Sequence, residues 1–191
     1  SAAGKTTLCR KICDYFDFDI SLLWQDSYYR DLEHLPLEER GRQNFDHPNA
    51  IDNDLFCEHL VLLKQNKPIN VPEYDFTTHT RSDSVKQLYS QKIVILEGMM
   101  LFADSRIRNL YDYKIYLELD PDIRFIRRLR RDIEELGRTV DSVITQYLDT
   151  VRPMHLEFVK PAKAHADIII NGMETDLAFE AAINFIDSQL G

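Results

Sequence analysis

The stretch Ser1-Ala2-Ala3-Gly4-Lys5-Thr6-Thr7 opens the chain and decides its fold. It matches the last part of the pattern G-x-x-x-x-G-K-[ST], a loop whose backbone N–H groups surround nucleotide phosphates. Gly4 permits the tight backbone path, Lys5 supplies a charge for the β- and γ-phosphates, and the Thr6 hydroxyl suits Mg²⁺. The first glycine of the pattern, and the strand that feeds such a loop, would precede Ser1. A chance turn of small residues into a helix is the alternative, and the rest of the chain decides between the two.

The residues after this loop alternate between helical and strand patterns. Leu8, Ile12 and Phe16 recur every four residues and predict a helix whose positive N-terminal end adds to an anion site. Short apolar runs predict buried parallel strands at 20–24, 92–98, 114–119 and 166–170. Helices are expected near 53–65, 105–110, 122–136, 139–158 and from 175 onward, the last with Leu177, Ala181, Phe185 and Ile186 facing inward. With the strand expected before Ser1, the pattern predicts an α/β fold with a doubly wound sheet of about five parallel strands.

Residues 69–90 stand apart from that sheet. Their first part alternates in character and contains Pro72, which favours an edge position. With the segment around Val85 to Tyr89 they are expected to form a β-hairpin. We therefore expect residues 1–191 to form a single domain that carries this hairpin and a basic region at 122–140.

Composition limits the class of protein. A chain of 191 residues suffices for one sizeable core, and no apolar run approaches the length that spans a membrane. The three cysteines, Cys9, Cys13 and Cys57, lack a disulfide-framework spacing and suit a reducing compartment. The formal net charge of −9 argues against nucleic acid as a general partner. A cytoplasmic protein without a membrane or nucleic-acid partner is expected.

Two acidic side chains follow the ends of predicted strands. Asp26 comes shortly after the strand 20–24, and Glu97 follows the apolar run of the strand 92–98. Ligands gather beyond the carboxyl ends of strands in open α/β sheets, and an acid ending a buried strand is costly unless it is paired or metal-bound. Glu97 therefore suits Mg²⁺ or its water shell. For Asp26, a helix cap or a turn is the alternative.

The predicted helix 122–136 carries arginines on one face. Arg124, Arg128 and Arg131 follow one another at four- and three-residue spacing. The apolar residues expected to pack the opposite side are Phe125, Ile126, Leu129 and Ile133. A solvated face and a nucleic-acid surface are the alternatives. In an acidic protein, arginines near an expected phosphate site fit a lid, because a phosphoryl transition state spreads negative charge over its oxygens.

Several segments together resemble the uridine–cytidine kinases of the phosphoribulokinase/uridine kinase group. They are SAAGKTT, QDSYYRD, NFDHPNAID, PEYDFTTHTR, ILEGMMLF, RRLRRDIEELGRT, QYLDTVRPMHLEFVKPAK and ADIII. QDSYYRD, NFDHP and YDFTTHTR are specific, since a generic phosphate-loop protein has no reason to carry them. The resemblance implies a P-loop nucleoside kinase fold with an Arg-rich helical lid. It also implies transfer of the γ-phosphoryl of ATP, or GTP, to the 5′-hydroxyl of uridine or cytidine with Mg²⁺, giving UMP or CMP in pyrimidine salvage, by a homotetramer.

The resemblance also implies roles for individual residues. Asp26 is the expected base for the 5′-hydroxyl proton, close to the Mg²⁺ ligands Thr6 and Glu97. The expected phosphate contacts are the loop Ser1 to Thr7, with Ala2, Ala3, Gly4, Lys5 and Thr6 among them, and the lid residues Arg131 and Arg138. The implied nucleoside contacts are Asp46 and Arg128 at the sugar, Tyr74, Phe76 and His79 at the base, and Tyr29, Phe45 and Gln146 in the pocket. Arg128 is also implied to stabilise charge in the reaction, which places it with Asp26, Lys5 and Arg131 among the catalytic residues.

The chemistry of these residue types agrees with that assignment. One carboxylate offers the bidentate acceptor that a ribose diol needs, and a flat base suits aromatic walls with polar groups at its edge. Ordinary core packing is the alternative for Phe45 and Phe76. The family often has an arginine where Leu136 stands, so one phosphate contact is expected to be absent or replaced.

Two other functions fit parts of the pattern. A phosphoribulokinase, or another small-molecule kinase of the group, needs basic residues where Tyr74, Phe76 and His79 stand. A nucleotide-driven switch without transfer activity predicts ATP consumption that is indifferent to uridine.

Overall fold

The computed structural model describes residues 1–16 and 20–190. The chain divides into two compact units. Unit 1 comprises Ser1–Phe16 and Tyr113–Gly191, and unit 2 comprises Asp17–Asp112. Each unit has its own pair of parallel strands with helices packed beside it.

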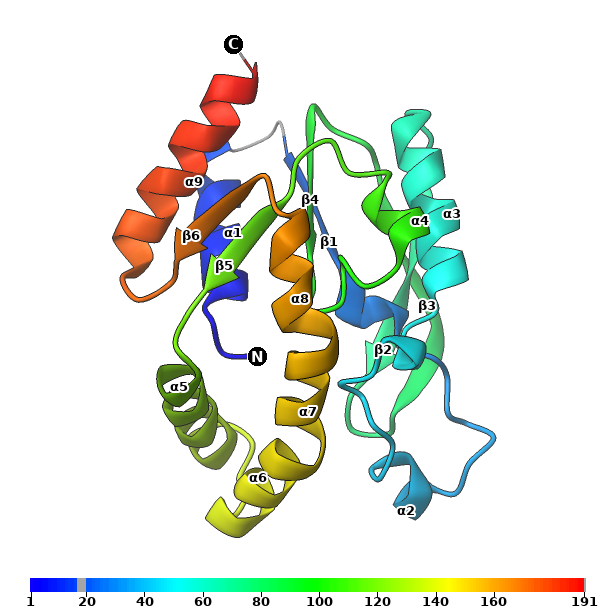
Figure 1. The fold of residues 1–191 in the computed structure, drawn as a ribbon. Helices are drawn as coiled ribbons and strands as arrows, with labels where there is room; N and C mark the ends of the chain where they lie inside the picture. The colour runs from blue at the N-terminus through cyan, green and yellow to red at the C-terminus, as the bar shows by residue number, and fades with distance from the viewer. Residues whose placement is uncertain (17–19, 191) are drawn as a thin grey trace. The chain divides into compact units, whose positions relative to one another are not determined.

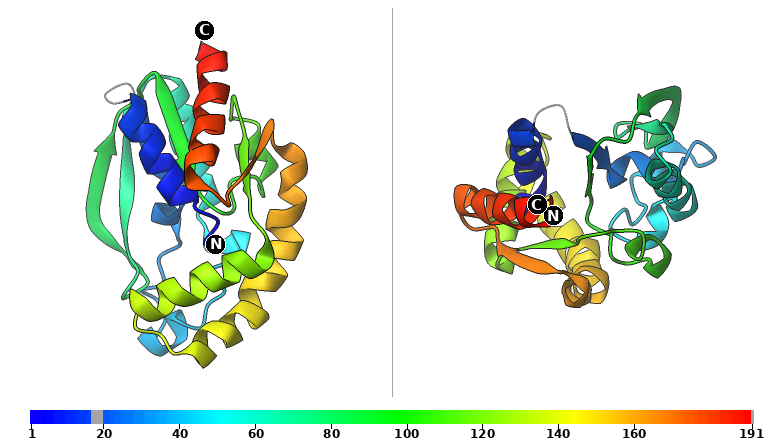
Figure 2. Two further views of the ribbon diagram at one scale, coloured as in Figure 1. Left: turned by 90° about the vertical axis from the view of Figure 1, so that its left-hand side faces the viewer. Right: turned by 90° about the horizontal axis from the view of Figure 1, so that it is seen from above.

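Unit 1 is built on the parallel pair β5 (Ile115–Glu118) and β6 (Ile168–Asn171). The helices α1 (Lys5–Phe16) and α9 (Thr175–Leu190) pack against each other on one face of this pair (Figures 1 and 2). They do so because each has an apolar side. The buried residues are Leu8 and Ile12 on α1 and Ala178, Ala182 and Ile183 on α9. Lys11 and Asp176 form an exposed ion pair between the two helices.

The rest of unit 1 is helical. The helix α5 (Pro121–Glu134) has Pro121 at its first position, where the missing N–H costs nothing. A nearly continuous helical run then extends over residues 140–165. Its parts are α6 (Val140–Gln146), η4 (Tyr147–Val151), α7 (Arg152–Met154), η5 (His155–Val159), α8 (Lys160–Ala162) and η6 (Lys163–His165). The segments η4 and η5 are π-helical and lie next to Pro153 and Pro161, which cannot donate the normal backbone hydrogen bond.

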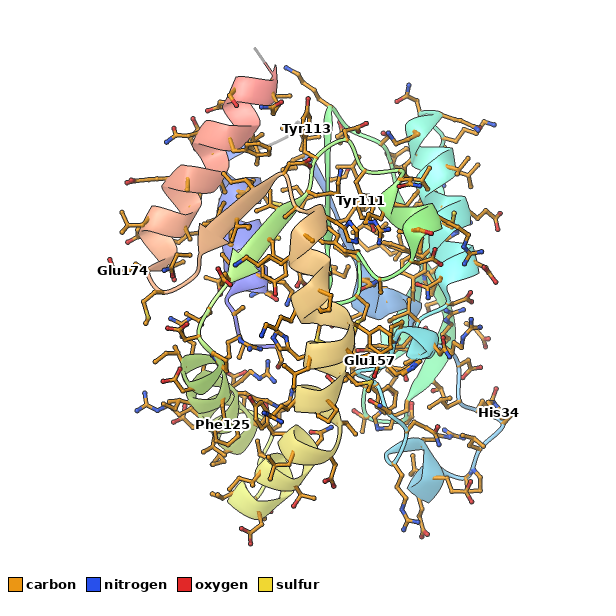
Figure 3. The ribbon with its side chains drawn as sticks, in the orientation of Figure 1. His34, Tyr111, Tyr113, Phe125, Glu157 and Glu174 are labelled. Carbon is orange, nitrogen blue, oxygen red and sulfur yellow. The ribbon has the colours of Figure 1, made fainter. Side chains whose placement is uncertain are left out.

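Side chains fix the start of this run and its packing on α5. The Thr139 hydroxyl caps α6 by accepting from the N–H of Ser142 at 3.2 Å. Phe125 projects from α5 (Figure 3), and its ring centroid lies 4.6 Å from that of Tyr147. The helical prediction for 139–158, continuing past Pro153, is confirmed.

Unit 2 is built on the parallel pair β1 (Ile20–Trp24) and β4 (Ile93–Glu97), with Trp24 opposite Glu97. Its helices are η2 (Gln25–Tyr28), α2 (Leu37–Arg40), η3 (Pro48–Ala50), α3 (Asn53–Lys64) and α4 (Ser105–Arg108). The Asp52 carboxylate caps α3 by accepting from the N–H of Leu55 at 3.2 Å. The core that these elements enclose contains Leu23, Tyr28, Ile51, Phe56, Leu60, Leu63, Ile69, Val71 and Ile107. In Figure 1, α3 and α4 lie side by side.

The predicted hairpin is present in unit 2. The strands β2 (Ile69–Asp75) and β3 (Thr80–Leu88) pair antiparallel, with a register shift between Pro72 and Tyr74. The Asp75 carboxylate accepts from the N–H of Thr77 at 2.7 Å and of Thr78 at 3.4 Å and so closes the turn. Hydrogen bonds from these two threonines lower the pKa of Asp75. The strand β3 begins earlier than the sequence predicts. Most of its residues are exposed and show no alternation of apolar and polar side chains, so the sequence pattern does not mark its start.

Two packing predictions are wrong in part. On α5 the buried residues are Arg124, Arg128 and Asp132; of the predicted apolar face, Ile126 is 46% exposed, whereas Phe125, Leu129 and Ile133 are half-buried. On α9, Leu177 is 60% exposed, and the buried face is shifted by one residue towards the C-terminus.

The α/β class with parallel strands and a hairpin is confirmed. The joining of both parallel pairs in one sheet of about five strands stays a prediction. In the described part of the chain, no helix has the length and apolar character needed to cross a membrane.

Candidate active site

The phosphate loop (Ser1–Thr7) lies in unit 1 and runs directly into α1. Gly4 has φ 95° and Ala2 has φ 55°, both in the left-handed region. A Cβ on Gly4 would only reach ordinary contacts near 4 Å, so the backbone conformation, and not space, requires glycine there. The N–H of Leu8 donates to the carbonyl of Gly4 at 2.9 Å and begins the helical hydrogen bonds. The predicted loop-to-helix anion site therefore has the expected local geometry.

A second turn in unit 1 supports the phosphate loop. A Cβ on Gly172, just after β6, would lie 2.8 Å from the carbonyl oxygen of Ala3. The N–H of Gly172 donates to Glu118 at the end of β5 at 2.7 Å, and Arg127 donates to the Gly172 carbonyl at 3.2 Å. Only glycine allows this close approach, which lets the chain at the ends of β5 and β6 pack directly against the loop.

Two of the predicted site arginines, Arg128 and Arg138, are linked to each other through Gln146, and Arg128 also contacts the loop. Arg128 donates from Nη1 to the hydroxyl of Ser1 at 2.9 Å and from Nη2 to Oε1 of Gln146 at 2.8 Å. Arg138 donates to the same Gln146 oxygen and to the hydroxyl of Ser142 at 2.7 Å. Unit 1 thus brings together the loop, Arg128, Arg138 and Gln146.

Asp132 is the residue of this cluster that sequence reasoning missed. Its side chain is only 1% exposed, and Arg131 donates to its Oδ1 from Nε at 2.9 Å and from Nη2 at 2.7 Å. Its spacing of four residues from Arg128 on a helix was the available signal. We define the arginine cluster as Arg128, Arg131 and Arg138 with their acceptors Asp132 and Gln146.

A second buried arginine on α5 faces a histidine. Arg124 donates from Nε to the carbonyl of Leu119 at 3.0 Å and directs its two terminal nitrogens at the His155 ring, at 3.4 and 3.1 Å. Burial, followed by the charge of Arg124, lowers the pKa of His155 to about 4. His155 is therefore neutral at pH 7 and accepts from the guanidinium.

Unit 2 contains the two predicted carboxylates. Asp26 lies in η2, directly after β1, and is exposed, whereas Glu97 ends β4 and is 8% exposed. Because Trp24 is opposite Glu97 in the parallel register, both acids lie at the same end of this strand pair. The strand-end placement predicted from the sequence is confirmed within this unit.

The side chain of Gln25 ties these two strand ends together. It is 1% exposed, and its Oε1 accepts from the N–H of Met100 at 2.9 Å. Gly98 must be glycine here, because a Cβ would lie 2.4 Å from the Gln25 side chain. Gln25 and Gly98 directly flank Asp26 and Glu97, so this contact fixes the backbones that carry both carboxylates. Sequence reasoning did not identify Gln25 as a supporting residue.

Five predicted nucleoside residues form an aromatic cluster: Tyr29, Phe45, Tyr74, Phe76 and His79. The rings of Phe45 and His79 are stacked, with centroids 4.7 Å apart and an interplanar angle of 22°. Tyr29 lies 5.5 Å from Phe45 and 5.4 Å from Tyr74, and Tyr74 lies 5.2 Å from Phe76. Phe76 is 60% exposed, which argues against ordinary core packing for this residue. The aromatic walls expected for a flat ring are thus present in unit 2.

Two features of the aromatic cluster point to a ligand. The Tyr74 hydroxyl is buried and, among the described residues, has no hydrogen-bond partner. Burial raises its pKa to about 12, so the hydroxyl keeps its proton and remains a donor at pH 7. His79 has φ 55°, a strained conformation at the end of the hairpin turn. A polar atom of a bound ring would satisfy the hydroxyl.

Arg81 holds the hairpin against the rest of unit 2. Its guanidinium donates to the carbonyls of Tyr29 at 3.0 Å and Tyr28 at 3.1 Å, and to the Asp52 carboxylate at 3.2 Å. Tyr28 in turn hydrogen-bonds His59 at 2.7 Å in the core. Sequence reasoning missed this role, although Arg81 stands two residues after His79 in a segment that it singled out.

The remaining predicted residues lie as follows. Asp46 is 9% exposed, next to Phe45 in the loop before η3. Leu136 is 62% exposed. A cavity of about 510 Å³ in unit 2 is lined by Trp24, Ser27 and Tyr74, among other residues, but not by Asp46 or His79.

The predicted metal ligands Thr6, Asp26 and Glu97 are divided between the two units, so this set stays a prediction. Within residues 1–16 and 20–190, no three His, Cys, Asp or Glu side chains group as a metal site.

Comparison with known proteins decides the family. The model of the "Phosphoribulokinase / Uridine kinase family" matches residues 1–178. The chain belongs to this family. Its relatives in the family include a protein named uridine kinase from Geobacillus kaustophilus, 54% identical over 89% of this chain and 81% of the relative. Another uridine kinase, from Anoxybacillus flavithermus, is 48% identical over the whole of this chain and 91% of the relative.

A solved structure agrees on the fold of this family member. Phosphoribulokinase from Rhodobacter spheroides matches with a TM-score of 0.64 at 14% identity, over 91% of this chain and 68% of that one. The phosphoribulokinase/uridine kinase family therefore accounts for the phosphate loop, the parallel strand pairs and the helices beside them.

Proposed function

We propose that this chain is a uridine kinase, which transfers the γ-phosphoryl of ATP, or GTP, to the 5′-hydroxyl of uridine or cytidine. The observation that carries the proposal is 54% identity over 89% of the chain to a protein of that name. The aromatic cluster supports it over phosphoribulokinase, because Tyr74, Phe76 and His79 stand where a sugar phosphate needs basic residues. A flat pyrimidine fits such walls.

Each predicted site residue has its own role in the proposed reaction. Asp26, exposed at the end of β1, accepts the proton of the 5′-hydroxyl as general base. The phosphate loop with Lys5 binds the β- and γ-phosphates, and Arg131 and Arg138 of the lid region 122–140 offset the charge that develops on the transferred group. Asp46 accepts from the ribose hydroxyls, and Arg128 contacts the sugar and helps to offset the charge on the transferred phosphoryl. Gln146 orients Arg128 through its oxygen. The hairpin 69–90 presents Tyr74 and His79 to the base edge.

The proposed magnesium ligands have the right chemistry. The hydroxyl of Thr6 and the carboxylates of Asp26 and Glu97 are hard oxygen donors, and a carboxylate as buried as Glu97 suits a cation. Mg²⁺ held by these oxygens would supply positive charge that stabilises the phosphoryl transfer.

We extend the proposal to the organisation of the protein. Residues 1–191 form one kinase domain whose parallel pairs belong to a single doubly wound sheet. The enzyme works as a cytoplasmic homotetramer in pyrimidine salvage. These statements rest on the resemblance to the family.

An ADP-release assay over a panel of acceptors tests the function. With Mg·ATP, uridine and cytidine are expected to stimulate ADP release, while ribulose 5-phosphate and buffer alone are not. Stimulation by ribulose 5-phosphate alone would assign the chain to the phosphoribulokinase branch. ATP consumption that ignores every acceptor would indicate a nucleotide-driven switch.

A further inference from the structure

Asp132 is an acidic side chain buried among the arginines of unit 1. Its Oδ1 accepts two hydrogen bonds from Arg131, at 2.9 and 2.7 Å. Its Oδ2 lies 3.4 Å from Nε of Arg128 and 3.5 Å from Nη1 of Arg138. The backbone N–H of Arg138 also donates to the Asp132 carbonyl at 3.0 Å. One carboxylate therefore contacts all three arginines of the arginine cluster.

These arginines come from different places along the chain. Arg128 and Arg131 are on α5, whereas Arg138 lies beyond the end of this helix, after Gly137, which has φ 64°. Three like charges at such distances repel one another. Asp132 offsets that repulsion, and the Gln146 oxygen adds a neutral acceptor shared by Arg128 and Arg138. Three guanidinium groups with one carboxylate still leave an excess of positive charge for an anion.

Asp132 is not placed to bind phosphate itself. Its side chain is 1% exposed, and a carboxylate repels phosphate oxygens. Its influence on a bound nucleotide must therefore pass through the arginines. Arg131, by contrast, has a side chain that is 43% exposed, so one part faces Asp132 while another remains accessible.

We propose that Asp132 is a positioning residue for phosphoryl transfer, which orients Arg128, Arg131 and Arg138 towards the nucleotide phosphates. The inference rests on the proposed function, because it assumes that these arginines meet the nucleotide. Loss of the Asp132 charge frees the guanidinium groups to turn and raises the net charge of the arginine cluster. Anions then bind more tightly to the free enzyme, but the transferred phosphoryl is held in a less productive geometry.

Steady-state kinetics of Asp132→Asn test this. The amide keeps the shape and removes the charge. The kcat is expected to fall about 10- to 100-fold, the range for slightly misplaced catalytic groups, while the KM for uridine changes little. The inhibition constant of inorganic phosphate is expected to decrease severalfold. The control is Glu134→Gln, an exposed change of the same kind on α5, which should leave all three constants unaltered.

A purely structural role for Asp132 predicts a different pattern. It would lower the melting temperature and the fraction of active enzyme, yet leave the KM values, the phosphate inhibition constant and kcat per active site unchanged. That result would overturn the proposal.

A double-mutant cycle separates this inference from the proposed function. Arg131→Ala should slow the enzyme, and adding Asp132→Asn should then cost much less than it does in the wild type. If Arg131→Ala itself has no effect, the proposed lid function fails. If Arg131→Ala slows the enzyme and Asp132→Asn does not, only the role of Asp132 fails.

A measurement on the wild type covers the case in which Asp132→Asn does not fold. Arginine side-chain NMR spectra, with the Arg131 signal assigned by its loss in Arg131→Lys, should show an Hε that exchanges slowly in the nucleotide-free protein. Exchange as fast as that of exposed arginines would show that Asp132 does not hold Arg131, and the proposal would be wrong.

Discussion

The side-chain amide of Gln25 fills the space beside the α-carbon of Gly98, and its oxygen accepts from the N–H of Met100 at 2.9 Å. This contact joins the ends of β1 and β4 next to Asp26 and Glu97. A methyl group on Gly98 would lie 2.4 Å from the Gln25 side chain, a clash that a small change of rotamer cannot relieve.

Gly98→Ala is therefore expected to destabilise the protein by about 1–3 kcal/mol, the usual effect of overpacking, and to lower kcat. Urea unfolding and steady-state kinetics measure the two effects. Gly41→Ala is the control for stability, since a Cβ there meets only the His79 ring at 4.0 Å and the φ of Gly41 is −66°. Equal stability of both variants would show that the Gln25 contact is not tight.

Tyr74→Phe separates ligand binding from folding. Because the buried Tyr74 hydroxyl has no partner among the described residues, its removal should leave stability unchanged or raise it by up to about 1 kcal/mol. The KM for uridine should rise about tenfold, the equivalent of one lost hydrogen bond of about 1.4 kcal/mol. Thermal unfolding and the uridine dependence of the rate check this. A loss of stability together with an unchanged KM would assign the hydroxyl to the fold.

Arg81→Met tests the link between the hairpin and α3. Arg81 and Asp52 have side chains that are 21% and 22% exposed, and Arg81→Met removes both this partly buried ion pair and the two hydrogen bonds from Arg81 to backbone carbonyls. We expect a loss of about 3 kcal/mol in the free energy of unfolding, with a raised KM for uridine. The comparison change Arg106→Met removes the ion pairs that a 58% exposed arginine makes with Asp54 and Asp104, and it should cost about 1 kcal/mol or less for each pair. Similar losses in both variants would contradict the role given to Arg81.

His155 makes stability depend on pH. Burial and Arg124 lower the pKa of His155 in the folded protein to about 4, below its ordinary value of 6.5. Between these pH values the unfolded chain binds a proton that the folded protein does not. The contribution of His155 to the free energy of unfolding is therefore fully present above pH 6.5, and it is lost as the pH falls towards 4. His155→Gln should remove this part of the pH dependence, as measured by urea unfolding from pH 7.5 to 4.5. Parallel curves for wild type and variant would show that His155 is not held neutral.

The element order was largely predictable because most strands and long helices have a local signal. The runs at 20–24 and 92–98 are apolar and short, and the Thr139 and Asp52 caps are standard helix starts. The strand β3 was predicted only in part, because its exposed residues give no alternation.

The buried face of α5 was mispredicted for a different reason. Sequence reasoning assigns burial to apolar side chains, yet Arg124 and Arg128 are buried because His155, Gln146, Ser1 and Asp132 supply acceptors. Except for Asp132, which stands four residues from Arg128, these partners are 18 to 127 residues away in the chain, so no local pattern reveals them. Gln25 and Arg81 were missed for the same reason, since their contacts are with distant backbone groups.

The most direct test of the kinase account follows the γ-phosphoryl group itself. With radiolabelled ATP and Mg²⁺, the wild-type protein should label the 5′ position of uridine, and Asp26→Asn should lower kcat by about 10²–10⁴, the usual effect of removing a positioned base. Label that appears only as inorganic phosphate, with or without uridine, would contradict the account.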